Sequence, residues 1–304
     1  MVLALYFQSL ATPTGSTMLL GLAANRLHHQ NEDAALFSFL RACEQGIREL
    51  NIGFHAVGRT YDAIAAAEML KGYKGMVRYP YGREGGLMKL VAEVVGMPGD
   101  NRVLDGAIYL IDPVDPSSIF PEALALKRQC VIHGKPFIST AASARDWVEM
   151  ERIHAGLAPD RHADRLHDYG NQTLALIAHD AMKPAMLEFC ERNFALLSRY
   201  RRRVGTGTTG QKLNELAWSK GWPVDKPWVD RFNSGPLGGD AQIADLVLER
   251  RCQRAIFFED PHVARQHEAD IQLLERAVTT VTQEVVCMTS PAVAQRWCDA
   301  AVKR

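Results

Sequence analysis

The feature that most constrains the fold of this chain is an internal repeat: four short motifs of the first half recur in the second half, in the same order. The pairs are Val57-Gly58-Arg59-Thr60 with Thr206-Gly207-Thr208-Thr209, Gly85-Gly86 with Gly238-Gly239, Ile111-Asp112-Pro113 with Glu259-Asp260-Pro261, and Ser139-Thr140 with Met288-Thr289. Their offsets stay between 148 and 153 residues. Gly-Gly and Asp-Pro are common turn dipeptides, but turn chemistry alone does not fix an offset. The pattern therefore predicts two copies of one fold.

A polar stretch marks the boundary between the two copies. The segment 151–171 is rich in His, Asp and Arg and contains Pro159 and Gly170, as expected of a linker. Residues 1–17 include Leu5-Tyr6-Phe7-Gln8-Ser9, which resembles part of an engineered protease site, so we interpret 1–17 as a tag remnant or a native tail. The expected domains are 18–150 and 172–304, and a chain of 304 residues is long enough for two.

Apolar runs in the second half alternate with helical patterns. Three short runs read as buried strands, namely 174–178, 255–258 and 284–287, and helical periodicity covers 185–199 and 242–249. Strands that alternate with helices indicate a mainly parallel sheet with helices on both faces. The expected fold class is α/β, with two tandem three-layer domains of Rossmann-like type.

Charge and composition exclude several classes of function. The chain has 35 basic and 35 acidic residues, and the short cluster 201–203 is too small to attract a nucleic-acid backbone or an anionic membrane. Without a long apolar segment or a signal-peptide pattern, we expect a cytoplasmic protein. The six cysteines form no C-x-x-C pair, which favours packed, reduced thiols over a zinc site or disulfides.

Polar residues follow the predicted strands of the second half, at the edge where parallel α/β sheets bind ligands. They are His179-Asp180 and Lys183, then the run 205–210 (GTGTTG), then 234–240 (SGPLGGD), then Asp260-Pro261, and finally His267 and Asp270. These segments should converge at one edge of the sheet.

The Gly/Thr run has the composition of a phosphate site. Glycines allow close backbone approach, amides and Thr hydroxyls donate hydrogen bonds, and a helix beginning near Gly210 would add its positive end. Lys183 could add a full charge. The plainer interpretation is that the run is only a turn and that Lys183 is a solvated helix residue.

Asp240 is the candidate base. A carboxylate beside a phosphate site can remove a proton next to a carbonyl, whereas local sequence alone favours an N-cap for the following helix. His179 and His267 are candidates to hydrogen-bond the oxygens of an enediolate, and Asp180, Asp260 and Asp270 supply further carboxylates at strand ends.

In this order, the motifs at 179–183, 205–210, 234–242, 257–261 and 267–270 closely resemble those of the methylglyoxal synthase family. The resemblance covers about 172–304. It implies a lyase that converts dihydroxyacetone phosphate to methylglyoxal and inorganic phosphate, a bypass of glycolysis, without metal or organic cofactor. It also implies a homo-oligomer and inhibition by phosphate, with no nucleic-acid or membrane partner.

Carried over by position, the resemblance makes Asp240 the catalytic base. His179 and His267 match substrate-contacting histidines, and Asp180, Asp260 and Asp270 match supporting carboxylates. The residues that correspond to the phosphate-holding set are Lys183, Thr206, Gly207, Thr208, Thr209, Ser234 and Gly235.

The first half is predicted to have the related fold without the reaction. The residues opposite the site are Asn25-Arg26 for His179-Asp180, Arg59 for Thr208, Leu87 for Asp240, Ile119 for His267 and Glu122 for Asp270, while Asp112 matches Asp260. Arg59, Arg78 and Arg83 could bind an anion or could equally be surface or pairing residues. We expect a packing or regulatory module.

Two other functions fit the same motifs. The chain could be a non-catalytic regulatory protein that binds a phosphorylated metabolite, because fold alone does not establish function. An isomerase acting on a similar enediolate is the third class, and it would have to retain the phosphate. A complete Asp240, His179 and His267 set favours the lyase.

Overall fold

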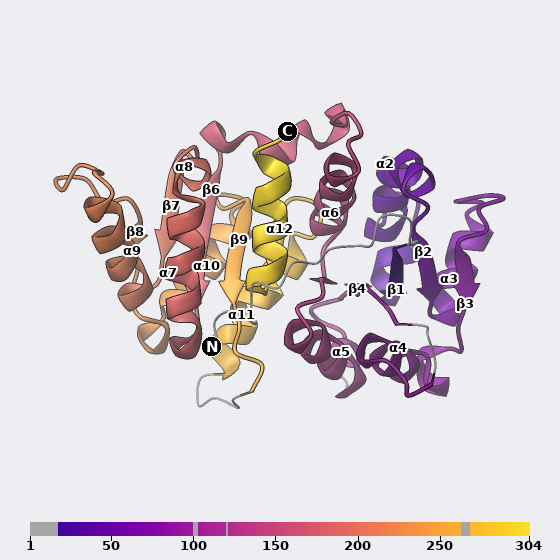
Figure 1. The fold of residues 1–304 in the computed structure, drawn as a ribbon. Coiled ribbons are helices and arrows are strands. Elements are labelled where there is room, and N and C mark those ends of the chain that lie inside the picture. Colours follow the sequence, from indigo (N-terminus) through magenta and orange to yellow (C-terminus); the bar gives the residue numbers. More distant parts are fainter. Residues whose placement is uncertain (1–17, 100–102, 120, 263–267) are drawn as a thin grey trace.

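The computed structural model describes residues 18–99, 103–119, 121–262 and 268–304, so the predicted tail at 1–17 and His267 lie outside the described residues. In this part of the chain, two five-stranded parallel sheets lie side by side with helices on both faces (Figure 1). The predicted α/β class with two three-layer units is confirmed.

The first sheet has the strand order β3-β2-β1-β4-β5. Its strands are β1 (Leu19–Ala24), β2 (Gly53–Ala56), β3 (Met76–Arg78), β4 (Gly106–Leu110) and β5 (Phe137–Ile138). Its helices are α2 (Ala35–Glu49), α3 (Gly58–Ala66), α4 (Gly86–Val95), α5 (Pro121–Ile132) and α6 (Ala141–His154), with 3₁₀ turns η1 (Arg26–His29), η2 (Gly82–Glu84) and η3 (Pro116–Ile119).

The second sheet has the order β10-β9-β6-β7-β8, which is the same arrangement relative to its first strand. Its strands are β6 (Thr173–Ala178), β7 (Arg202–Gly205), β8 (Asp230–Arg231), β9 (Arg254–Phe258) and β10 (Val286–Met288). Its helices are α7 (Lys183–Arg192), α8 (Phe194–Leu197), α9 (Gly207–Ser219), α10 (Gly239–Leu248), α11 (Glu268–Thr280) and α12 (Pro291–Ala301), with 3₁₀ turns η6 (Asp180–Met182) and η7 (Gly235–Leu237).

The repeated glycine motifs begin equivalent helices. Gly58 and Gly207 are the first residues of α3 and α9, and Gly86 and Gly239 are the first residues of α4 and α10. A Cβ on Gly86 would lie 2.2 Å from the Pro80 carbonyl oxygen, and one on Gly239 would lie 1.9 Å from that of Asn233. Close backbone approach therefore requires glycine at both positions.

After their first residues, Thr173 and Arg254, the central strands β6 and β9 are apolar, because both faces of the sheet are covered. Every residue of β6 and β9 is buried.

One helical pattern differs from expectation: the predicted helix at 185–199 is divided into α7 and α8 at Asn193, whose side-chain amide donates to the Phe189 carbonyl. The same carbonyl accepts the Asn193 backbone N–H at 3.1 Å, so Asn193 closes the last turn of α7 with both its backbone and its side chain.

The two halves share one apolar core on one side of the sheets. A single cluster includes Phe39 and Leu40 from α2, Trp147 from α6, Phe189 from α7 and Trp297 from α12. On the other side each sheet has its own cluster, formed with α4 and α5 in the first half and with α10 and α11 in the second. The halves are therefore not independent units.

Helix α6 follows the first sheet but packs between α2 and α12 (Figure 1). Its Asp146 carboxylate accepts 2.7 and 3.0 Å hydrogen bonds from the Arg254 guanidinium of β9, and both side chains are 1% exposed. The guanidinium lies over the Trp297 ring, 4.4 Å from its centroid. A salt bridge buried in this way joins the two halves.

The connection between the halves differs in extent from the expected linker at 151–171. Helix α6 continues through His154, and Glu151 within that last turn is buried and pairs with Arg296 of α12. The remaining connection contains the 3₁₀ turns η4 (Arg161–His167) and η5 (Tyr169–Asn171), with Ala163 and Tyr169 buried. Polar composition was a poor guide to the boundary here because those polar side chains are paired across the interface.

Among the described helices, none is long and apolar enough to cross a membrane. All six cysteines are free, and five are buried. Burial raises the pKa of the Cys43, Cys130, Cys252 and Cys287 thiols to about 12, which keeps them protonated and unreactive. The predicted packed thiols are confirmed.

Candidate active site

A cavity of about 290 Å³ opens at the carboxyl end of β6, the central strand of the second sheet. At this point the connections that follow neighbouring strands run to opposite sides of the sheet. The crevice between them is the usual ligand site in such folds. Nine residues singled out from the sequence line it: His179, Asp180, Lys183, Thr206, Thr208, Thr209, Ser234, Gly235 and Asp240. Three of the segments expected to converge, 179–183, 205–210 and 234–240, are therefore brought together, whereas Asp260 and Pro261 do not line the cavity.

His179 is held in one tautomer by the loop that follows β9. Its backbone N–H donates to the Phe258 carbonyl at 3.1 Å, and its Nδ1 accepts from the Asp260 N–H at 2.9 Å. A backbone amide can only donate, so Nδ1 carries no proton and the neutral ring carries its proton on Nε2. Asp260 thus acts on the site through its backbone, and its side chain does not line the cavity.

The Gly/Thr run forms the first turn of α9. That helix begins at Gly207, three residues earlier than expected, because the Gly207 N–H donates to the Asn233 carbonyl at 3.0 Å and the turn closes there. Helix geometry gives the amides of Thr208 and Thr209 no acceptor within α9. The buried Thr209 hydroxyl also has no hydrogen-bond partner among the described groups. These donors at a helix N-terminus suit an anion.

Gly207 does not line the cavity, although we expected it in the phosphate-holding set. A Cβ on this residue would lie 2.9 Å from the Ser234 nitrogen. The glycine is therefore needed for close contact between the start of α9 and the 234–240 segment. This contact places Ser234 and Gly235 on the cavity wall.

Asp240 is not the N-cap of α10. Gly238, with φ of 85°, occupies that position, α10 begins at Gly239, and no side chain caps the helix. Asp240 is the second helical residue and lines the cavity, where a Cβ on Gly235 would lie only 2.8 Å from its Oδ2. The N-cap interpretation was wrong because a left-handed glycine ends the preceding turn and takes the cap position.

Lys183 contributes the positive charge of the cavity. Its Nζ donates to Asp180 Oδ1 at 2.6 Å, and their side chains are 18% and 88% exposed respectively. An ammonium has three N–H donors, so this pairing leaves donors for a second acceptor. The plainer interpretation of Lys183 as a solvated helix residue does not hold, since its side chain is largely covered.

Sequence reasoning missed the apolar wall of the cavity. It consists of Ile177, Ala178, Pro236 and Phe257, with the Phe257 ring in edge contact with His179 at a centroid separation of 4.8 Å. The alternation of side chains along β9 was the available signal, because it places Phe257 and Phe258 on opposite faces. Asp270 belongs to α11, and its side chain is outside the described part of the structure.

No group of three His, Cys, Asp or Glu side chains within the described ranges is arranged to hold a metal ion.

The fold and this cavity define a doubly wound α/β protein with a polar ligand pocket at the end of its central strand. Over 105 residues the chain is 43% identical to a methylglyoxal synthase of Thermus thermophilus, a match that covers 34% of this chain and 76% of that protein. The chain belongs to the methylglyoxal synthase family, and the extent of the match is consistent with a methylglyoxal-synthase-like C-terminal part.

Two further comparisons concern the same family. Methylglyoxal synthase of Pseudoalteromonas atlantica is 39% identical over 121 residues, covering 40% of this chain and 83% of that protein. A solved methylglyoxal synthase from Elizabethkingia anophelis NUHP1 is 29% identical, covers 42% of this chain and 78% of its own, and aligns with a TM-score of 0.33. No family model matches the chain.

Proposed function

We propose that the chain is a methylglyoxal synthase, a lyase that converts dihydroxyacetone phosphate to methylglyoxal and inorganic phosphate. The observation that carries the proposal is the Asp240 carboxylate in a small cavity that also holds a lysine, three threonines and a histidine of fixed tautomer. Family membership supports the same activity.

The phosphate group binds at the start of α9. The amides of Thr208 and Thr209, the Thr209 hydroxyl and the Lys183 ammonium are the donors that this end of the cavity offers. A bound dianion gains from both the helix dipole and the ammonium. Anchoring the phosphate also orients its ester bond for cleavage.

Asp240 removes a proton from the carbon that bears the hydroxyl group. The electron pair of that C–H bond forms the carbon–carbon double bond of an enediolate, and the charge moves to the former carbonyl oxygen. The Nε2–H of His179 is the donor that stabilises this oxygen, because the Asp260 amide fixes the proton on that nitrogen.

Loss of phosphate completes the reaction. As the hydroxyl of the enediolate gives up its proton, the double bond shifts and the carbon–oxygen bond to phosphate breaks, with its electron pair leaving on the phosphate. The resulting enolate takes up a proton at its terminal carbon and becomes methylglyoxal. No oxidant, reductant or further reactant is consumed.

The test compares two substitutions on the same helix. Asp240→Asn keeps shape but removes the base, whereas Asp245→Asn makes the same change at an exposed residue of α10. We expect wild type and Asp245→Asn to release equal amounts of phosphate and methylglyoxal from dihydroxyacetone phosphate, and Asp240→Asn to be about 10²–10⁴ slower.

Other outcomes would assign a different function. Undiminished turnover by Asp240→Asn would overturn the choice of base. A folded wild type that binds phosphate without forming either product would be the non-catalytic regulatory protein, and one that forms glyceraldehyde 3-phosphate without phosphate release would be an isomerase.

A further inference from the structure

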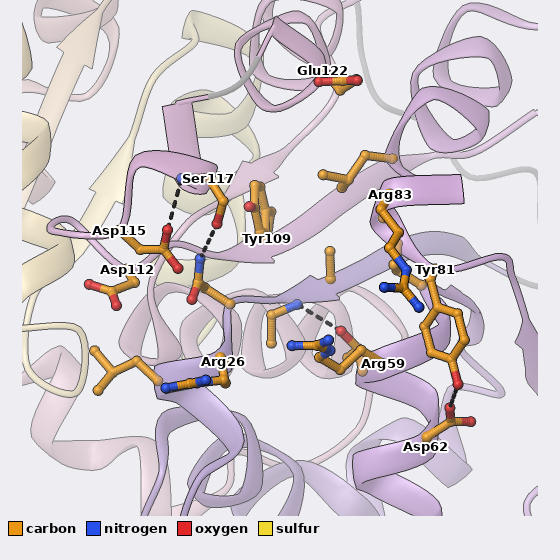
Figure 2. Close-up of a pocket in the computed structure, with 18 of the residues that line it drawn as sticks. Arg26, Arg59, Asp62, Tyr81, Arg83, Tyr109, Asp112, Asp115, Ser117 and Glu122 are labelled. Carbon is orange, nitrogen blue, oxygen red and sulfur yellow. Dashed lines mark hydrogen bonds between the residues drawn. The ribbon is translucent and has the colours of Figure 1, made fainter. Parts of the chain in front are cut away.

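A second cavity, of about 880 Å³, lies at the carboxyl end of β1 in the first sheet (Figure 2). Its position is equivalent to that of the first cavity. The Asn25 N–H donates to the Leu110 carbonyl at 2.9 Å, just as His179 does to Phe258, and Gly85 has the left-handed φ of 91° that matches Gly238. The volume is within the range of pockets that hold metabolites and cofactors.

This cavity lacks the groups that the proposed lyase reaction needs. Leu87 lies on its wall where Asp240 lies in the other half. Asn25 replaces His179, and its side-chain amide is used to donate to Ser117 Oγ at 3.1 Å and Ser118 Oγ at 3.0 Å. A ligand here would be bound without proton abstraction.

Three guanidinium groups reach the cavity from three separate segments. They belong to Arg26 in η1, Arg59 in α3 and Arg83 in η2 (Figure 2). None of the three has a carboxylate within salt-bridge distance among the described residues, and Arg83 lies 6.0 Å from the centroid of the Tyr81 ring. A guanidinium group that is not paired with a carboxylate keeps its N–H donors for an anionic ligand.

Arg78 behaves differently from the other arginines that the sequence singled out. Its guanidinium donates to both oxygens of Asp62, at 2.8 and 2.9 Å, and it does not line the cavity. The Tyr81 hydroxyl also donates to Asp62, at 2.9 Å. Arg78 is therefore a pairing residue, and that pair orders the Tyr81 ring beside Arg83.

The wall that faces Arg59 and Arg83 offers hydrogen-bond acceptors and also carries Arg26 (Figure 2). Asp112 and Asp115 follow β4. The Asp112 Oδ1 accepts the Val114 N–H at 3.0 Å, and the Asp115 Oδ1 accepts the Ser117 N–H at 2.8 Å, the latter drawn in Figure 2. The Ser117 amide holds the pKa of Asp115 below its ordinary value, so this carboxylate is ionised near neutral pH. Tyr109 lies between the acidic and basic walls.

We propose that this cavity binds a phosphorylated metabolite with several hydroxyl groups, larger than a triose phosphate, and does not convert it. The phosphate lies between Arg59 and Arg83, with Arg26 nearby, and the hydroxyl groups donate to Asp112 and Asp115. A sugar phosphate and a nucleoside monophosphate share this chemistry, and the experiment separates them. The proposal does not depend on the lyase activity of the other half.

The test is calorimetric titration of the full chain with glucose 6-phosphate, AMP and inorganic phosphate, using glucose and adenosine to measure the need for the phosphate group. The test variant is Arg59→Ser/Arg83→Ser. Arg41→Ser is the matched control, because Arg41 lies on α2 of the same half and outside the cavity. Lys183→Met removes the charge of the C-terminal cavity and so separates the two sites.

We expect glucose 6-phosphate or AMP to bind with a Kd below about 1 mM and more tightly than inorganic phosphate. The affinity for the organic phosphate that binds should fall at least tenfold in Arg59→Ser/Arg83→Ser. It should stay unchanged in Arg41→Ser and Lys183→Met. Absence of binding by both organic phosphates, or binding lost in Lys183→Met and retained in the double variant, would overturn the proposal. Because the readout is binding, a failure here is distinct from a failure of lyase activity.

Discussion

At the scale of single residues, two threonines at equivalent positions have different hydrogen bonding. Thr60 Oγ1 accepts from the Ala24 N–H at 2.9 Å, whereas the buried Thr209 hydroxyl has no partner among the described groups. A polar atom buried without a partner costs stability, so its presence is better explained by a ligand than by folding.

Thr209→Val should therefore leave stability unchanged or slightly higher while it raises KM for dihydroxyacetone phosphate several-fold. Thr60→Val should lose about 1–3 kcal/mol of stability, because it leaves the Ala24 amide unsatisfied. Thermal unfolding and steady-state kinetics on both variants check the pair. A stability loss in Thr209→Val equal to that in Thr60→Val would mean that its hydroxyl has a structural role.

Gly235 and Gly82 form a second matched pair. A Cβ on Gly235 would lie 2.8 Å from Asp240 Oδ2, whereas one on Gly82 would meet nothing within 4 Å. Gly235→Ala should displace the carboxylate and lower kcat by about 10²-fold, since small misplacements of a catalytic group have effects of this size.

Gly82→Ala should leave kcat unchanged. Both variants should keep near-wild-type melting temperatures, because a carboxylate at the end of a side chain can move. Equal kcat values for the two variants would show that contact with Gly235 does not position Asp240.

At the scale of secondary structure, α6 is the element that most clearly departs from its place in the sequence. It follows the last strand of the first sheet, yet its Asp146 pairs with Arg254 of the second sheet. Two charges buried together are tolerated because each satisfies the other, and the Leu166 carbonyl accepts a further 3.0 Å hydrogen bond from Arg254.

Asp146→Ala should therefore lower the free energy of unfolding by about 3–5 kcal/mol, because it leaves a buried guanidinium without its partner. The control is Asp62→Ala, which breaks a pair between side chains that are 44% and 41% exposed and should cost far less stability, because solvent screens exposed charges. Urea denaturation measures both. Similar losses in the two variants would mean that the Asp146 pair is not a principal link between the halves.

At the scale of the whole molecule, the connection between the halves carries a pH-sensitive group. The His167 side chain is 4% exposed, near Asp146. Burial lowers its pKa to about 4, against an opposing effect of the Asp146 charge. Between pH 6.5 and 4 the unfolded chain therefore binds a proton that the folded chain does not, so stability from this group is present above pH 6.5 and is lost as the pH falls to 4.

The expected loss over this range is about 3 kcal/mol, from 1.36 kcal/mol for each unit of pKa difference. His167→Gln cannot titrate and should flatten this part of the pH profile, whereas His262→Gln, at an exposed residue, should not. Unfolding free energies at several pH values between 4 and 7 check this. An unchanged slope in His167→Gln would remove His167 as its source.

Much of the architecture could be predicted because it depends on local patterns. Apolar runs with turn residues between them identified β6, β9 and β10 to within two residues, whereas the helix expected near Gly210 begins three residues earlier. The polar residues after those strands were found for the same reason, since parallel strands bring their carboxyl ends to one edge.

Side-chain partners could not be predicted in this way. Nothing local distinguishes Arg78, which pairs with Asp62, from Arg59 and Arg83, which reach the cavity. Nor does local sequence show that Phe257 forms a wall of the first cavity or that Asp240 is the second residue of its helix. Each depends on what another segment brings within a few ångströms.

The residue pattern was enough to predict two α/β halves, the alternation of strands and helices in the second half, and the chemical character of the edge where polar residues gather. Periodicity and turn chemistry are local, so they can be read residue by residue. It took the folded chain to show that α6 joins the halves, that one cavity brings Asp240 together with Lys183, and that the other brings three arginines together. Those outcomes follow from packing between segments distant in sequence, where distances of a few ångströms decide which charges are paired.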